Sequence, residues 1–194
     1  MSKSIAFIIG AGQRIGAGVA DALQSKGYRI ALAARSLKSE DSTGDRLHLP
    51  VDLSSPESVA PAFASLRKQW GEPSVVFYNG THPHPKPPNH LSALLTYIIA
   101  AAVHFADPSH PLSPSLADFT QDLSINTISL YAAIKESHAS FEALPASAAK
   151  VFLYTGNSLN ITPQPAFTTL GVGKTASAHV IGLASGAYAG KGYK

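Results

Sequence analysis

Three glycines near the start of the chain have the spacing of a phosphate-binding loop. They lie in the stretch Gly10-Ala11-Gly12-Gln13-Arg14-Ile15-Gly16, between a short apolar run and a run with apolar residues at helical spacing. Glycines permit a tight turn and a close approach of the backbone to a pyrophosphate, and the N–H groups at the start of a helix favour an anion. Nucleotide binding is therefore the favoured interpretation, and a tight turn without a ligand is the alternative.

A basic residue, Arg35, follows the second apolar run of the chain. In a dinucleotide-binding unit the end of the second strand meets the adenosine ribose, where an acidic residue favours NAD and an arginine accommodates the 2′-phosphate of NADP. Arg35, with Arg14 in the glycine loop and Lys38 nearby, predicts NADP(H) as the cofactor. The alternative is an exposed charge that only increases solubility.

The elements that must position these residues follow an alternating pattern. Apolar runs predict strands at residues 4–9, 28–34, 47–51, 75–78 and 150–154. Helical spacing predicts helices at residues 15–26, 56–70, 115–143 and 173–189. Continuous apolar strands that alternate with helices predict an α/β fold with a doubly wound parallel sheet, covered on both faces.

The composition limits the class of protein. A chain of 194 residues suits one domain, 1–194, and 45% hydrophobic residues with 14% charged residues are too apolar for disorder. The 15 Lys and Arg residues are scattered, which argues against nucleic acid as a partner. Neither a long apolar run nor a signal-peptide core is present, and the chain has no cysteine, so we expect a cytoplasmic protein without a membrane span.

A proline- and histidine-rich segment interrupts the pattern at residues 81–111. Its apolar part, residues 91–105, is too short to cross a bilayer. A buried or dimer-covering helix is the favoured interpretation, and a lid over a pocket is the alternative. His82, His84 and His90 lack supporting carboxylates at ligand spacing, so we expect no metal site.

The order of these features resembles the short-chain dehydrogenase/reductase family, whose members have a Rossmann fold. The resemblance covers nearly the whole chain except residues 81–111. It is carried by Gly10, Gly12 and Gly16, by Arg35, by Asp52-Leu53 after the third strand, by Asn79-Gly80 after the fourth, by Asn126 in the long helix and by Lys174.

The resemblance implies roles for the residues that match. Asp52 and Leu53 would lie by the adenine, and Asn79 and Gly80 would line the cofactor cleft. Lys174 would bind the nicotinamide ribose. The loop between Gly12 and Gly16 would hold the pyrophosphate, although the family usually has a glycine where Arg14 stands.

The active-site signature of the family is incomplete in this chain. Its tyrosine falls four residues before the lysine, where this chain has Leu170. Leucine cannot donate the proton that carbonyl reduction requires. The family's serine falls at Asn157, with Ser158 adjacent, and either side chain could orient a substrate oxygen. Asn126 would hold a water or a backbone carbonyl beside Lys174.

Two candidates for the missing proton donor remain open from the sequence. Lys174 could protonate the substrate directly if burial lowers its pKa. Tyr154, at the end of the fifth strand, has the nearest aromatic hydroxyl in the sequence. A packed strand aromatic is the favoured interpretation of Tyr154, and binding of the cofactor ribose alone would account for Lys174.

These observations predict an NADP(H)-dependent oxidoreductase of the short-chain type that acts on a small carbonyl or alcohol. The alternatives are a catalytically inactive NADP(H)-binding regulatory protein and a non-redox enzyme on the same scaffold. Apolar faces of the helices at 115–143 and 173–189 predict a homo-oligomer. Residues 190–194 have the pattern of a turn into another strand, so we expect either a shortened fold or a truncated chain.

Overall fold

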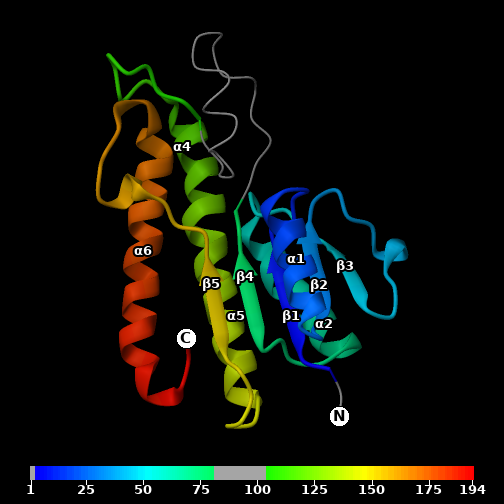
Figure 1. Ribbon diagram of the computed structural model, residues 1–194. Coiled ribbons are helices and arrows are strands. Elements are labelled where there is room, and N and C mark those ends of the chain that lie inside the picture. Colours follow the sequence, from blue (N-terminus) through cyan, green and yellow to red (C-terminus); the bar gives the residue numbers. More distant parts are fainter. Residues whose placement is uncertain (1–2, 81–103) are drawn as a thin grey trace.

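The computed structural model describes residues 3–80 and 104–194, in which five parallel strands form one sheet with the order β3-β2-β1-β4-β5 (Figure 1). The strands are β1 (Ile5–Ile9), β2 (Arg29–Ala34), β3 (Arg46–Pro50), β4 (Val75–Tyr78) and β5 (Val151–Tyr154). Every predicted strand is confirmed, with its ends shifted by no more than one residue. The expected parallel sheet is therefore present.

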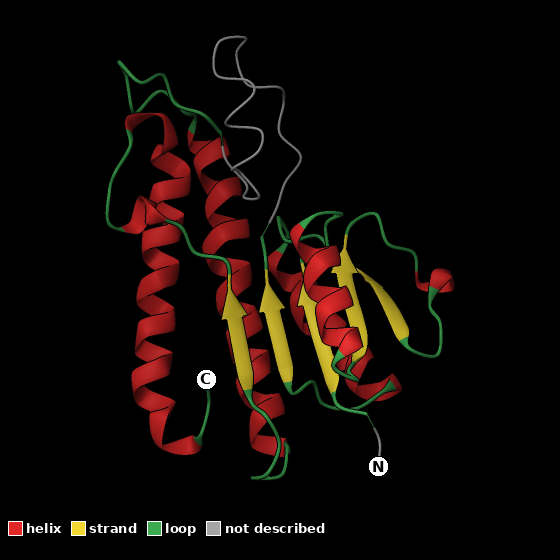
Figure 2. Ribbon diagram, viewed as in Figure 1, coloured by secondary structure: helices red, strands yellow, loops and turns green. Residues whose placement is uncertain are grey.

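Helices cover both faces of this sheet (Figure 2). They are α1 (Ile15–Ser25), α2 (Val59–Gln69), α4 (Leu116–Leu123), α5 (Ser129–Ala143) and α6 (Thr168–Tyr188). Helix α1 packs on one face, and α2 and α5 pack on the other. Helix α6 lies beside α4 and α5 (Figure 1). This is the doubly wound α/β arrangement that the sequence predicts.

The central strand β1 explains why the apolar runs are continuous. All five of its residues are buried. Ala6 and Ile8 belong to the core beneath Ala20 of α1, whereas Phe7 faces the opposite layer and meets the ring of Phe63 of α2 edge-on, with centroids 4.9 Å apart. Because side chains of a strand alternate between the two faces, a strand covered on both sides must be apolar at every position.

The predicted long helix over 115–143 is confirmed as one helical run, but a π-helical turn interrupts it at Ser124–Ile128. Ser115 begins the run with a capping box, in which its hydroxyl accepts a hydrogen bond from the Asp118 N–H at 3.1 Å. The hydroxyl of Tyr78 donates to the carbonyl of Ile125 at 2.5 Å. A tyrosine of the sheet thus donates a hydrogen bond to a backbone carbonyl of the π-helical turn. No local sequence pattern predicts this contact.

Helix α6 begins at Thr168, so the predicted start at residue 173 was wrong. Glycine weakens an isolated helix, and Gly171 and Gly173 lie in the first two turns of α6. Tertiary contacts stabilise this end of the helix: Leu170 is buried against Leu159. A Cβ atom on Gly173 would lie 2.8 Å from Cβ of Asn126, so only glycine lets α6 approach the π-helical turn this closely. The tertiary contact outweighs the low helical propensity.

The last residues turn back toward the sheet, as the sequence predicts. Gly192 adopts a left-handed conformation with φ of +72°. The N–H of Lys194 donates to the carbonyl of Lys150 at 3.0 Å, and the Phe152 N–H donates to the carbonyl of Lys194 at 2.8 Å. This pair of bonds has the pattern of a parallel ladder, so Lys194 lies alongside β5.

The sequence also predicts an insertion at residues 81–111 and the absence of a membrane span. Most of the predicted insertion, residues 81–103, lies outside the described residues, and so do its proposed helix and lid. Among the residues that the structure does describe, no helix is long and apolar enough to cross a membrane.

Candidate active site

The glycine loop lies where the sheet reverses its order. Strand β1 leads to β2 on one side, and β4 pairs with its other edge, so the carboxyl ends of β1 and β4 border a crevice. Gly10 follows β1 with φ of +80°, and a Cβ atom there would lie 1.7 Å from the carbonyl oxygen of Asn79. Gly80, after β4, is also close to its neighbours, since a Cβ atom would lie 3.2 Å from the carbonyl oxygen of Ile125. The glycines at both strand ends therefore allow close backbone packing.

The other two glycines of the loop have different surroundings. A Cβ atom on Gly16 would lie 2.7 Å from Cα of Ala11, whereas one on Gly12 would meet nothing within 4 Å. Gly12 thus borders open space. Helix α1 begins at Ile15, with no acidic residue in its first turn and no side-chain cap from Arg14. A helix start of this kind presents N–H groups and a positive dipole end to an anion.

A chain of hydrogen bonds connects this loop to Lys174. The side-chain amide of Asn79 donates to the carbonyl of Gly10 at 3.3 Å, and its Oδ1 accepts from the hydroxyl of Thr155 at 3.0 Å. Nζ of Lys174 donates to the carbonyl of Thr155 at 2.8 Å. The structure therefore links Asn79 to Lys174 through Thr155. Thr155 was missed, and its position directly after the fifth strand was the available signal.

Lys174 is almost fully buried, with 3% of its surface exposed. Burial lowers the pKa of this lysine to about 8. Its ammonium also lies over the ring of Tyr154, 4.7 Å from the centroid. Burial raises the pKa of Tyr154 to about 12, which makes that hydroxyl a weak acid. Of these two sequence candidates for a proton donor, Lys174 has the pKa closer to neutrality.

Asn126 lies against the helix that carries Lys174. It is 1% exposed and stands in the π-helical turn, where its side chain meets Gly173. Its side-chain amide donates to the carbonyl of Asp122 at 3.0 Å, and its carbonyl accepts from the hydroxyl of Ser177 at 2.6 Å. These contacts fix Asn126 against Gly173 and Ser177, which flank Lys174 on α6.

Leu170 has an apolar environment. It is 2% exposed and packs with Leu159, Phe105 and Phe167, and the two phenylalanine rings meet edge-on with centroids 5.6 Å apart. Leu170 stands one helical turn before Lys174 on α6. The position four residues before the lysine is therefore filled by a packed aliphatic side chain.

Asn157 and Ser158 lie on the loop that follows β5, and both are exposed. The Oδ1 atom of Asn157 accepts a hydrogen bond from the Leu159 N–H at 3.1 Å and so caps a short 3₁₀ turn, Ser158–Asn160. This contact gives Asn157 a structural role. Since Leu159 packs on Leu170, the loop still passes over the first turn of α6.

The other residues expected to bind the cofactor differ in their surroundings. Arg35 and Arg14 are exposed, and Asp52 is half-buried, with its carboxylate accepting from the Ser54 N–H at 3.0 Å. Ile15 is 42% exposed at the start of α1. Leu53 is 6% exposed, its side chain belongs to the hydrophobic core, and its carbonyl accepts a hydrogen bond from the hydroxyl of Ser129 at 2.7 Å.

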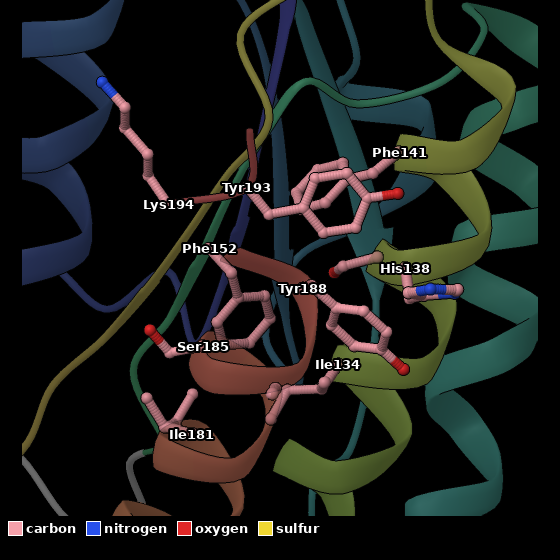
Figure 3. Close-up of a pocket in the computed structure, with 11 residues that line it drawn as sticks. Ile134, His138, Phe141, Phe152, Ile181, Ser185, Tyr188, Tyr193 and Lys194 are labelled. Carbon is pink, nitrogen blue, oxygen red and sulfur yellow. The ribbon is translucent and has the colours of Figure 1, made fainter. Parts of the chain in front are cut away.

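An apolar pocket lies elsewhere, between α5, α6 and β5 (Figure 3). Aromatic side chains form much of its lining, and the rings of Phe141 and Tyr193 meet edge-on with centroids 5.4 Å apart. Lys194 also lines it and pairs with the start of β5, whereas the network of Lys174 lies at the carboxyl end of the same strand. The pocket is therefore separate from the crevice at the glycine loop.

The sequence was compared with models of known protein families and with curated proteins. No model of a known protein family matches the sequence. The short-chain dehydrogenase/reductase dmxR12 of Cryptosporiopsis sp. (strain 8999) is 44% identical over 197 residues, which cover 100% of this chain and 75% of the relative.

Solved structures with low sequence identity share the fold. The RhlG/NADP active-site complex of Pseudomonas aeruginosa superimposes with a TM-score of 0.77 at 16% identity, covering 100% of this chain and 70% of that one. The 3-ketoacyl-(acyl-carrier-protein) reductase of Brucella melitensis, complexed with NADH, gives 0.76 at 16% identity, covering 100% and 72%. With its Rossmann-type sheet and its 44% identity to dmxR12, this chain belongs to the short-chain dehydrogenase/reductase family of oxidoreductases.

Proposed function

We propose that this protein is an NADP(H)-dependent oxidoreductase that acts on a small carbonyl or alcohol. The observation that carries the proposal is the hydrogen-bond chain from Gly10 through Asn79 and Thr155 to Lys174. It follows the carboxyl ends of β1, β4 and β5, which is the edge where a dinucleotide binds in an open α/β sheet.

The cofactor would be held by the loop and by the strand ends. Gly12, Gly16 and the start of α1 would bind the pyrophosphate, with Ile15 exposed beside it. Arg35 and Arg14 would pair with the 2′-phosphate. The adenine would lie by Asp52 and the backbone of Leu53, and the cleft would be lined by Asn79 and Gly80. Among the neighbours in fold, the printed name of the Pseudomonas aeruginosa complex includes NADP.

The bound cofactor would supply or accept a hydride, and the side chains of this chain would bind and orient the reactants. Lys174 would bind the nicotinamide ribose, because its Nζ is held at the end of β5 by Thr155. Asn126 would keep α6 in register with that site. Asn157 and Ser158, on the exposed loop, would orient the oxygen of the small-molecule substrate.

A titration of the purified protein tests this proposal. We expect NADPH fluorescence to report tight, saturable binding, with weaker binding of NADH. Absorbance at the nicotinamide band is then followed with aldehydes, ketones and quinones, and at least one of them should be reduced. Failure of both nucleotides to bind would overturn the proposal.

A second function is favoured by the buried Leu170. A protein that binds NADP(H) without turnover, or that catalyses a non-redox reaction on the same scaffold, would not need a hydroxyl at this position. Tight binding of NADPH without its oxidation by any carbonyl would support this second function over the first.

A homo-oligomer is also part of the proposal. Exposed apolar side chains stand on the helical run α4–α5 and on α6, among them Leu116, Tyr131 and Leu183, which are 80%, 52% and 61% exposed. Such residues on adjacent helices would be covered by a second copy of the chain. Light scattering that gives the mass of a monomer at all concentrations would contradict this part.

A further inference from the structure

A histidine and a buried aspartate form a pair outside the residues considered so far. Asp122 of α4 is 1% exposed, and its carboxylate holds His104 at two points. One oxygen accepts from the backbone N–H of His104 at 2.7 Å, and the other lies 3.0 Å from Nδ1 of the ring. Both the position of the residue and the orientation of its ring are therefore set by one carboxylate.

The second ring nitrogen of His104 lies near a different carboxylate, that of Asp118. Nε2 of His104 lies 3.4 Å from a carboxylate oxygen of Asp118, one turn earlier on α4, and the side chain is 29% exposed. The charged groups that face the ring are thus the two carboxylates of α4, and on α6 the neighbouring group is the hydroxyl of Thr169. The exposed edge of the ring gives it access to water.

This pair lies beside the position where the family has its tyrosine. The hydroxyl of Thr169 donates to the carbonyl of His104 at 3.2 Å, and Ala106 donates through its N–H to the carbonyl of Ala166 at 3.0 Å. Phe105, between them, packs in the cluster that covers Leu170. The segment that closes over Leu170 therefore also brings an ionisable side chain to the first turn of α6.

Asp122 is also connected to the residues near Lys174. Its backbone carbonyl accepts a hydrogen bond from the side-chain amide of Asn126 at 3.0 Å, one helical turn further along. A buried carboxylate is costly unless it is paired, and here its oxygens are committed to His104. His104 is thus the partner that the buried carboxylate of Asp122 requires.

We propose that His104, oriented by Asp122, is the proton donor in carbonyl reduction by this protein. The inference rests on the function proposed above. Asp122 binds Nδ1–H, so Nε2–H is the acidic group. The substrate carbon receives the hydride from NADPH, the π electrons of its carbonyl move to the oxygen, and the Nε2–H bond breaks as the O–H bond forms. The imidazole then regains a proton from water at its exposed edge, and Asp122 acts as a positioning residue.

The test compares His104→Ala and Asp122→Asn with a matched control, His110→Gln. His110 is an exposed histidine of the same segment. The probe substrate is phenanthrenequinone, with NADPH binding measured separately by fluorescence. A positioned general acid contributes about 100-fold or more, so we expect His104→Ala to lower kcat by at least that factor while the Kd for NADPH changes by less than about 3-fold.

Three further readouts separate proton donation from a merely structural contact. Free imidazole should restore part of the kcat of His104→Ala and leave His110→Gln unchanged. Asp122→Asn should fall between the wild type and His104→Ala. Proton NMR of the protein without nucleotide should show a downfield, slowly exchanging ring N–H that is lost in both variants and kept in the control.

The outcomes distinguish the two proposals. If the wild type reduces the quinone and His104→Ala retains its kcat, the role of His104 is overturned and the proposed function stands. If the wild type binds NADPH but reduces no carbonyl, both are overturned. Loss of kcat in His104→Ala without rescue by imidazole, together with a lower unfolding temperature, would show a structural contact and overturn the role of His104.

Discussion

Lys174 and Thr155 are joined by a hydrogen bond in which Nζ donates to a backbone carbonyl at 2.8 Å. The carbonyl belongs to the residue directly after β5, so the main chain of the sheet edge fixes the position of the ammonium. Through the hydroxyl of the same threonine, the lysine is connected to Asn79 at the end of β4. A side chain on α6 is thereby aligned with two strand ends, and this relationship leads to the first prediction.

Stability should rise with pH because of Lys174. Burial lowers its pKa from 10.5 to about 8, so the unfolded chain holds this proton more tightly than the folded protein does. The cost of burying the charge is fully present below pH 8 and disappears as the pH rises to 10.5. Relative to Lys174→Met, the wild type should gain on the order of 3 kcal/mol across this window. Urea unfolding at both ends of the window checks this, and an unchanged difference would contradict it.

Two glycines of the loop should respond differently to alanine. Gly10→Ala places a Cβ atom 1.7 Å from the carbonyl oxygen of Asn79 at a φ of +80°, so the free energy of unfolding should fall by about 3 kcal/mol or more. Gly12→Ala meets no atom within 4 Å, so this variant should fold normally. Its methyl group would stand where a pyrophosphate approaches, and NADPH binding should weaken about 10-fold or more. Thermal unfolding and NADPH titration measure both effects, and equal stability of the two variants would argue against the described loop.

Arg35 should determine the preference between the two nucleotides. Arg35→Ala removes a guanidinium from the end of β2, where it would pair with the 2′-phosphate. We expect the Kd for NADPH to rise by about 10- to 100-fold and the Kd for NADH to stay nearly constant. Fluorescence titration measures both constants. Lys26→Ala is the control, because this exposed lysine lies at the opposite end of α1; a matching loss there would point to net charge alone.

Arg67 should stabilise the packing of α2 on α5. Its guanidinium bonds Glu136 at 2.7 Å and Glu72 at 3.0 Å, and it also donates to the hydroxyl of Ser140 at 3.1 Å. Arg67→Met leaves these partly buried acceptors without their donor and should lower the free energy of unfolding by about 2 kcal/mol. Urea denaturation compares it with Lys68→Met, which changes an exposed neighbour. Similar urea midpoints for the two variants would mean that the contacts of Arg67 contribute little to the free energy of unfolding.

Position 170 should not accept a tyrosine freely. Leu170 is 2% exposed in an apolar cluster, so a larger ring must displace Leu159 or Phe105. Both Leu170→Phe and Leu170→Tyr should lower stability by about 1–3 kcal/mol, with the tyrosine costing more because its hydroxyl enters apolar surroundings. Thermal unfolding of the pair gives the answer, and a Leu170→Tyr variant as stable as the wild type would show that this cluster has room for the ring.

Local patterns in the sequence were sufficient for the sheet and for the glycine loop. Every strand was predicted within one residue because a strand covered on both faces must be continuously apolar. Gly10 was identified from its position between a predicted strand and a predicted helix, and Asn79 from the resemblance to the family. The family assignment, supported by the 44% identity to dmxR12, rests on the same order of residues.

The tertiary structure decided the features that depend on contacts between distant residues. The early start of α6 is stabilised by the packing of Leu170 on Leu159, and the burial of Leu53 follows from its place in the core. The bonds from His104 to Asp122 and from Thr155 to Lys174 join residues 18 and 19 positions apart. No periodicity within a single element specifies such pairs, because they form only when a loop, a strand end and a helix are folded against one another.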